Sequence, residues 1–384
     1  MRIVICSNIA NGIGLQREFE LLRDYLTALG HEVTGQQWDQ PAVTAGDLCI
    51  WIEVFSEHLV PIAPRHWLFA NPEWMKPEYI RGIQRHCEIV FAKTRDAERV
   101  LRGVFNNVHY VGFLTTDKRD GTVARDHRFL HIGGNSGFRN TNAVIDAWRG
   151  YRYWNGTEAA DAPITIVSNS KSTAFEGAEG VTFVKRGTDE EIKRLQNSCL
   201  FHILPSAYEG FGHALHEALS VGAILLSTGA GPMAEVQAPF QIPSIRIRKN
   251  NLAILHEVAP EAIRECVPRM LALPSQEIAK ISLIARLKFE RDNNAFTERF
   301  QPFLTTIDHK VTSSIPPSQK RLKIVLLGNL EAPYSTENDL AWTLRDMGHY
   351  VLPAQENSIS TENILKLSDG ADLLIYVHTH GWVF

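Results

Sequence analysis

The sequence predicts an α/β protein with two doubly wound parallel sheets and the beginning of a third such unit. Three observations carry this prediction. Short apolar segments alternate with longer amphipathic ones, which is typical of parallel strands covered by helices on both faces. A small-residue loop at residues 7–14 separates the first apolar segment from the first amphipathic one, as at the opening of a doubly wound sheet. Near the C-terminus the opening pattern starts again, which indicates an internal repeat.

The first unit opens with an apolar segment at residues 3–6 and continues into a loop that holds Gly12 and Gly14. In the segment that follows, apolar residues recur at alternating steps of four and three, as one face of a helix requires. Gly30 supplies the C-terminal stop of that helix. The further strands of this unit are expected at residues 47–54, 66–70, 89–92 and 109–111.

The second unit begins near residue 127. Its strands are expected at residues 129–132, 164–167, 181–184, 201–204 and 223–226. Its helical patterns fall at residues 142–149, 190–196 and 213–221. Residues 260–307 read as mostly helical, with no clear strand between them. The first 310 residues therefore hold two Rossmann-like sheets and a helical tail.

The C-terminal segment repeats the first unit after a polar, proline-bearing linker, TSSIPPSQ. Three segments recur in the same order, so a duplication explains them better than coincidence. The matching pairs are residues 3–8 with 324–329, 26–33 with 344–351, and 47–52 with 372–377. The repeat stops after about three strands, and a half sheet with an apolar edge is a poor independent domain. We therefore expect a longer natural protein or a truncated chain.

These patterns predict five parts of the chain. They are an N-terminal Rossmann-like domain at residues 1–120, a second Rossmann-like domain at 121–285, helices that cross back to the first domain at 286–310, a linker at 311–320, and a partial third unit at 321–384.

The composition excludes several classes of protein. Of the 384 residues, 44% are apolar and 21% are charged, which is the profile of a globular chain and not a disordered one. The net charge of −4 argues against a general polyanion-binding surface. The five cysteines are far apart and show no zinc-ligand spacing, as in a reduced intracellular protein. No apolar run reaches the ~18 residues of a membrane span, so we expect a cytoplasmic protein.

The stretch that carries most information about chemistry is LPSAYEGFGHALHEALSVG, residues 204–222. A buried strand ends at Leu204, a glycine loop carries Glu209, and a helix begins around His213 with Glu217 about one turn inside it. Loop glycines let the backbone approach a ligand closely, and a helix N-terminus suits a diphosphate. The pattern is thus typical of a nucleoside diphosphate sugar site. An ordinary strand-to-helix turn with solvated acids is the alternative.

The segment EGFGHALHE, residues 209–217, resembles the E-x7-E motif of retaining GT-B glycosyltransferases, the glycosyltransferase family 4-like enzymes or "glycosyl transferases group 1". FLHIGGNSGFRNT resembles the phosphate-binding segment of that family, and VKRGTDEEIKRLQNSCLFHILPS resembles the run that leads into the motif. The N-terminal segment NGIGLQREFELLRDYLTALGHEV is similar to the family's opening. The resemblance covers residues 1 to about 307. It implies the GT-B fold, in which two Rossmann-like domains face each other across a cleft.

The resemblance also implies roles for single residues. Glu209 would contact the donor sugar near the reacting carbon, and Glu217 would bind the nucleotide ribose. The backbone of Phe211 and Gly212 would hold sugar hydroxyls and phosphate, with the helix that starts at His213 facing the diphosphate.

Arg139 stands where the family has its phosphate-binding lysine, and its guanidinium fork suits that task. Gly12 and Gly14 would let the first loop approach the donor phosphates or the acceptor. The sequence departs from the family at two positions: Asn135 replaces a second cation, and Asn140 replaces a glycine. Arg186, Lys185 or Lys93 could supply the missing charge.

Two further segments of the first unit are candidates for the acceptor side. In FANPEW, Glu73 could act as the acceptor base, and Trp74 could stack on a sugar or a base; a turn with a packed tryptophan is the alternative. Lys93 ends a strand and could reach phosphate, although an ordinary solvated lysine is the alternative.

No Asp-x-Asp pair occurs, and His213 and His216 alone make a weak metal site. We therefore expect a metal-independent, retaining hexosyltransferase that needs no cofactor and uses a nucleoside diphosphate sugar, with a UDP-sugar favoured. The acceptor stays open between a glycan, a lipid-linked glycan, a protein and modified DNA. The alternative is a non-catalytic nucleotide-sugar-binding or scaffold module of a larger transferase.

Overall fold

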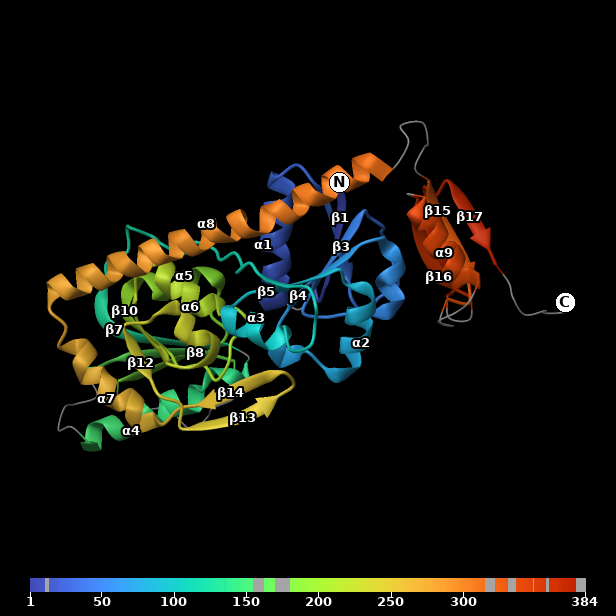
Figure 1. Ribbon diagram of the computed structural model, residues 1–384. Helices are drawn as coiled ribbons and strands as arrows, with labels where there is room; N and C mark the ends of the chain where they lie inside the picture. The colour runs from blue at the N-terminus through green and yellow to red at the C-terminus, as the bar shows by residue number, and fades with distance from the viewer. Residues whose placement is uncertain are drawn as a thin grey trace. The chain divides into compact units, whose positions relative to one another are not determined.

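The computed structural model describes residues 1–10, 14–134, 136–154, 162–169, 180–314, 322–330, 336–347, 349–356 and 359–377. The chain divides into two compact units. The first unit comprises residues 1–92, 101–110 and 298–384, and the second comprises residues 93–100 and 111–297. Figure 1 shows the helices and strands of both and labels most of them.

The first unit is built on a six-stranded parallel sheet with the order β2-β1-β3-β4-β5-β6. Its strands are β1 (Arg2–Ser7), β2 (Glu32–Gln37), β3 (Leu48–Ile52), β4 (His66–Ala70), β5 (Ile89–Ala92) and β6 (Val108–Tyr110). Its helices are α1 (Gly14–Ala28) and α2 (Pro77–His86), and α3 (Arg95–Leu101) lies on the segment shared with the second unit. Sequence patterns predicted all of these strands except β2. This strand, EVTGQQ, lies at a sheet edge and has mostly polar residues, so it lacks the apolar signal of a covered strand.

The second unit is built on another six-stranded parallel sheet, with the order β12-β11-β10-β7-β8-β9. Its strands are β7 (Asp126–Gly134), β8 (Ile164–Ser168), β9 (Val181–Val184), β10 (Cys199–Leu204), β11 (Ile224–Thr228) and β12 (Phe240–Ile242), followed by a hairpin of β13 (Arg246–Asn250) and β14 (Ala253–Glu257). Its helices are α4 (Thr141–Trp154), α5 (Asp189–Ser198), α6 (His213–Ser220) and α7 (Pro260–Leu271). Two mixed α/β units with parallel sheets confirm the predicted fold class.

The core of the second unit contains stacked aromatic residues from the central strands. Phe129 of β7 and Phe201 of β10 are fully buried, and their ring centroids lie 4.8 Å apart. Trp148 of α4 packs edge-on against Phe129 and donates a hydrogen bond from Nε1 to the carbonyl of Ala162, at 2.8 Å. Burying each such side chain contributes about 1.5–3 kcal/mol, so β7 and β10 form a rigid base for the loops that follow them.

Helix α8 (Ser275–Ser314) is one long helix that contributes residues to both units. In the first unit its Phe300 is fully buried, with ring centroids 5.2 Å from Phe91 and 5.4 Å from Phe69. The helix continues to Ser314, into residues 311–320 that were expected to be a linker, because no proline or glycine lies between Pro302 and Pro316. Residues 315–320 lie outside the described residues. None of the described helices is both long and apolar enough to cross a membrane.

The boundary expected at residue 120 also differs from the structure, which assigns residues 111–120 to the second unit. Three backbone amides of this segment bind side chains of the second unit. The amide of Thr115 donates to Asn293 Oδ1 at 3.0 Å, that of Lys118 to Ser220 Oγ at 3.1 Å, and that of Asp120 to Asn197 Oδ1 at 2.8 Å. These long-range hydrogen bonds carry no local sequence signal.

The C-terminal segment forms a three-stranded parallel sheet with the order β16-β15-β17. Its elements are β15 (Lys323–Gly328), α9 (Thr336–Asp346), β16 (Tyr350–Gln355), α10 (Thr361–Ser368) and β17 (Leu373–Tyr376). The order repeats that of β2-β1-β3, and the register repeats too. Ile3 is paired with Val33 and Leu48, as Ile324 is paired with Val351 and Leu373.

Side-chain hydrogen bonds recur in this repeat as well. Asp47 Oδ2 accepts a hydrogen bond from the amide of Arg2 at 2.8 Å, and Asp372 Oδ2 accepts one from the amide of Lys323 at 2.9 Å. A second recurring pair joins a glutamine to the asparagine at the end of the first strand: Gln37 to Asn8 at 3.2 Å and Gln355 to Asn329 at 3.1 Å. The repeated sequence segments therefore share individual hydrogen bonds as well as strand order.

Candidate active site

The candidate site lies where β7 and β10 end in the second unit. The two strands are parallel neighbours, with Phe201 paired with Phe129, so the loops after Gly134 and Leu204 leave the same edge of the sheet. In open parallel sheets this edge is the usual place for a ligand. The loop after β10 is buried along most of its length, including Ser206 and Glu209.

Arg139 and Glu209 form an ion pair between the two loops. Arg139 ends a short 3-10 turn, Gly137–Arg139, and its side chain is 22% exposed, while Glu209 is only 6% exposed. Ser206 Oγ donates a hydrogen bond to Glu209 Oε1 at 2.6 Å, and Arg139 Nη1 lies 3.5 Å from the same hydroxyl. The structure thus brings together the two residues to which the resemblance assigned the donor sugar and its phosphate. It adds Ser206, which lies two residues after the end of β10.

Asn140 explains one departure from the family pattern. Its backbone has φ 50° and ψ 32°, the left-handed conformation that glycine adopts most easily and asparagine tolerates best among other residues. Its side-chain amide donates to the carbonyl of Pro205 at 2.7 Å and to that of His256 at 3.2 Å. The asparagine therefore keeps the backbone turn that a glycine would make and also ties the β7 loop to the β10 loop.

Gly212 forms the turn into α6. It has φ +90°, and a Cβ there would lie 2.9 Å from Leu215 Cδ1, so a side chain at this position is strained. Its carbonyl accepts the amides of Leu215 at 2.9 Å and His216 at 3.1 Å, which begins the helix. The N-terminus of α6 therefore follows directly after the buried loop of Glu209, as an anion-binding helix terminus requires.

Aromatic side chains hold this helix start in place. The rings of Phe211 and His216 are stacked, with centroids 4.2 Å apart, and His213 meets Phe211 edge-on at 5.2 Å. Burial lowers the pKa of His216 to about 4, so its ring is neutral at pH 7 and stacks on Phe211 without burying a charge. No group of three or more His, Cys, Asp or Glu side chains within the described part of the chain could hold a metal ion.

Glu217 is buried at 4% exposure, and its Oε2 accepts a hydrogen bond from Gln196 Nε2 at 2.7 Å. Gln196 is itself fully buried at the end of α5. Both acids of the motif are therefore buried and hydrogen-bonded, and the alternative of an ordinary turn with solvated acids is wrong.

A cavity of about 340 Å³ lies at the ends of β7 and β8. Its walls come from the loop that carries Arg139, from the start of α4 and from the end of β8. The lining residues are Gly134, Ser136, Gly137, Asn140, Thr141, Asn142, Ala143, Ser168 and Asn169.

The structure places the other predicted residues as follows. Lys93 belongs to the second unit and is 1% exposed, with Nζ 5.1 Å from the ring centroid of Phe113, so it is not a solvated lysine. Arg186 is exposed, has φ 53°, and makes no ion pair among the described residues.

In the first unit, Glu73 is buried in the 3-10 turn Pro72–Trp74, whereas Trp74 is 49% exposed and is not a packed core residue. Gly14 is the first residue of α1. Gly12 and Asn135 lie outside the described residues, as does part of the loop after Ser168.

Comparison with known proteins identifies the class to which this architecture belongs. Residues 169–270 match the family model described as "Glycosyl transferases group 1". This segment contains the buried loop of Glu209, helix α6 and Glu217, and the resemblance predicted from the sequence is confirmed for it. The match supports glycosyl transfer as the type of activity. No curated protein sequence matches the chain significantly.

Solved structures of glycosyltransferases share the fold. The chain is similar to a glycosyltransferase from Rickettsia africae, with a TM-score of 0.61, 11% identity, and coverage of 80% of this chain and 98% of that one. It is also similar to the E. coli trehalose-6-phosphate structure bound with UDP-2-fluoro glucose, with a TM-score of 0.57, 10% identity, and coverage of 80% and 99%. A third is the pneumococcal O-GlcNAc transferase GtfA in complex with UDP and GlcNAc, with a TM-score of 0.52 and 10% identity. The match to GtfA covers 75% of this chain and 59% of that one. The fold of this chain is thus GT-B.

Proposed function

We propose that the chain is a retaining glycosyltransferase that takes its sugar from a nucleoside diphosphate sugar. The observation that carries the proposal is the buried Arg139–Glu209 ion pair, fixed by Ser206, directly before the N-terminus of α6. A cation and a helix N-terminus beside one loop suit a diphosphate. The buried carboxylate between them suits the hydroxyls of the attached sugar. A UDP-sugar is favoured because two of the structural neighbours were solved with UDP or a UDP-sugar analogue.

The reaction breaks the bond between the anomeric carbon and the diphosphate oxygen, and the electron pair leaves with the diphosphate. Arg139 and the first amides of α6 would stabilise this developing negative charge, an electrostatic contribution that is often the largest in catalysis. The sugar then carries oxocarbenium character, and Glu209 would lie near it. Attack by an acceptor hydroxyl on the face that the diphosphate has left retains the anomeric configuration.

Donor recognition would extend along α6. Glu217 would accept both ribose hydroxyls, and the hydrogen bond from Gln196 fixes one oxygen of its carboxylate. The backbone of Phe211 and Gly212 would hold sugar hydroxyls and phosphate, where a side chain at position 212 would be strained. Asn135, Lys93 and Arg186 remain candidates for further phosphate contacts. We expect no metal ion and no cofactor.

On the acceptor side we propose roles for the first unit. Glu73 is a buried carboxylate at the carboxyl end of β4, where the base that takes the proton of the acceptor hydroxyl would come from. Gly12 and Gly14 would allow the first loop to approach the substrates. The acceptor is a glycan or a lipid-linked glycan by preference, with a protein or modified DNA as the other options.

The test is a panel of nucleotide sugars with release of nucleoside diphosphate as the readout. We expect one donor, a UDP-sugar, to be turned over slowly without acceptor and independently of EDTA. Glu209→Ala and Arg139→Ala should both lose this turnover. Arg81→Ala is the matched control, because Arg81 is an exposed residue of α2 in the first unit. A donor that binds without any turnover would instead support a nucleotide-sugar-binding module of a larger transferase.

A further inference from the structure

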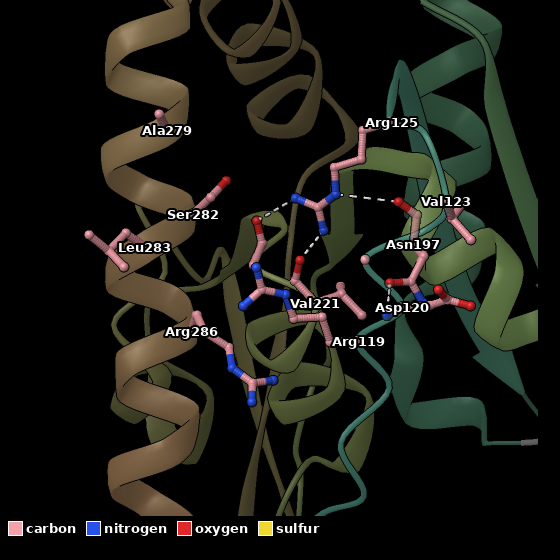
Figure 2. Close-up of a pocket in the computed structure, with 12 residues that line it drawn as sticks. Arg119, Asp120, Val123, Arg125, Asn197, Val221, Ala279, Ser282, Leu283 and Arg286 are labelled. Carbon is pink, nitrogen blue, oxygen red and sulfur yellow. Dashed lines mark hydrogen bonds between the residues drawn. The ribbon is translucent and has the colours of Figure 1, made fainter.

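A second cavity, of about 370 Å³, lies at the opposite edge of the same sheet (Figure 2). Its walls come from the segments that lead into β7, β10 and β11, and from the face of α8 that carries Ser282 and Arg286. The six residues of β10 separate these amino ends from the candidate donor site by about 20 Å, at about 3.3 Å per residue. The cavity is therefore a separate place from the site described above, and its volume falls in the range of small-molecule pockets.

Arg125 reaches into this cavity and pairs with no carboxylate among the residues that the structure describes. Its guanidinium donates to three backbone carbonyls: that of Gly222 at 2.8 Å, that of Asn197 at 3.3 Å, and that of Val221. Carbonyl groups carry no net charge, so none of these bonds neutralises the arginine. Burial and the nearby charge of Arg119 lower the pKa of Arg125, but a guanidinium stays protonated at neutral pH.

Two other charged residues that line the cavity, Arg286 and Asp120, have interactions of their own. Arg286 is neutralised by Asp117 at 2.7 Å and by Glu290 at 2.6 Å. The carboxylate of Asp120 is hydrogen-bonded to the amide and hydroxyl of Thr122, at 3.0 and 2.6 Å. The Arg119 side chain is exposed and makes no ion pair in the described part of the chain. Figure 2 shows Arg119 and Arg125 extending toward the same space.

We infer that this cavity binds the phosphate group of a small molecule between Arg119 and Arg125. Two guanidinium groups that repel each other across a hollow are relieved by a doubly charged oxyanion, and both can offer paired N–H donors to its oxygens. The site goes beyond the proposed function and does not depend on it, because none of its lining residues belongs to the donor site.

The cavity also contacts the C-terminal end of α6, the helix whose N-terminus lies at the candidate donor site. Val221 and Gly222, whose carbonyls Arg125 binds, directly follow α6, and Gly212 at the other end begins it. A phosphate held by Arg125 therefore competes with the C-terminal carbonyls of α6 for the positive charge of that arginine. The N-terminus of the same helix faces the proposed donor. This position is that of a regulatory ligand and not of a substrate.

The experiment is isothermal titration of the full chain with inorganic phosphate and with glycerol 3-phosphate, at constant ionic strength. Arg119→Gln is the diagnostic variant, since this exposed side chain makes no hydrogen bond that folding needs. Arg125→Gln is the second variant, and circular dichroism reports whether it folds. Arg81→Gln is the control for the loss of one surface charge, and Arg139→Gln removes the cation of the donor site instead. Vesicles containing phosphatidylglycerol replace the soluble phosphates in a parallel flotation arm.

Phosphate should bind the wild type and Arg81→Gln alike, and at least tenfold more weakly to Arg119→Gln. Binding of the soluble phosphates assigns the ligand to a free metabolite, and flotation that depends on Arg119 assigns it to a lipid headgroup. Equal affinity in wild type and Arg119→Gln overturns the inference. So does phosphate binding that is lost in Arg139→Gln and kept in Arg119→Gln, because the anion then occupies the donor site. Donor turnover tests the proposed function separately. A result that overturns the phosphate site therefore does not decide the proposed function.

Discussion

The substitution Arg139→Gln tests the ion pair of the candidate active site. It removes the cation from Glu209, which is 6% exposed and keeps only the hydrogen bond from Ser206 at 2.6 Å. Loss of one partner from a fully buried ion pair costs about 3–5 kcal/mol. Because Arg139 is 22% exposed and Ser206 remains, we expect about 2 kcal/mol, within the range of about 1.5–3 kcal/mol for hydrogen bonds to charged groups. For a unit of this size that corresponds to a fall of about 4–8 °C in melting temperature.

A double-mutant comparison separates this loss of stability from the loss of catalysis. In Arg139→Gln/Glu209→Gln no charge is left buried, so most of the melting temperature should return. Donor turnover should stay about 10²–10³-fold below wild type in the single and the double variant, as when one electrostatic donor is removed from a transition state. Calorimetry and nucleoside diphosphate release measure the two quantities on the same samples. Equal melting temperatures for the single and the double variant would refute the ion pair. Full donor turnover in either variant would refute the role of the pair in catalysis.

Three further outcomes are expected. Asn140→Ala should lower the free energy of unfolding, measured by urea titration, by about 2 kcal/mol, because it combines left-handed backbone strain with lost hydrogen bonds. Asn140→Gly should cost less than half of that. Equal losses for the two variants would contradict the backbone explanation. Glu217→Ala should weaken UDP binding by about ten- to a hundredfold in titration calorimetry, and an unchanged affinity would remove the ribose contact. Burial lowers the pKa of His131 and His216 from 6.5 to about 4, so both take up protons on unfolding. Their stability contribution is complete above pH 6.5 and is lost as the pH falls toward 4, at up to about 1.4 kcal/mol per pH unit each; His216→Gln should flatten this slope in urea unfolding between pH 7 and 5.

Much of the fold follows from local apolar patterns. The strands β4 and β5 are short runs of apolar residues that no surface segment resembles, and both were predicted at their observed positions. The polar strand β2 and the hairpin of β13 and β14 were not predicted. In β13 the sequence RIRKN is mostly exposed, so neither its burial nor its alternation marks it as a strand.

The candidate site was predictable only in part. The resemblance placed Arg139 and Glu209 in one site, and the sheet order explains why, since β7 and β10 are adjacent although 70 residues separate the two side chains. It could not show that Arg139 binds Glu209 itself, because the partner of a side chain depends on loop geometry. Asn140 departs from the glycine of the family pattern. Its left-handed backbone shows that it performs the task of a glycine.

The shared register of the two repeats has a consequence for folding. A chain with two strand sets of equal backbone pattern can exchange strands between them while it folds. Position 35 discriminates against this exchange. In β2 it is Gly35, and a Cβ there would lie 2.7 Å from the ring of Phe19. The equivalent residue of β16 is Pro353, paired with Leu326 as Gly35 is paired with Ile5. A swapped β16 would place the proline ring against Phe19, so Gly35 disfavours β16 as a strand of the first sheet.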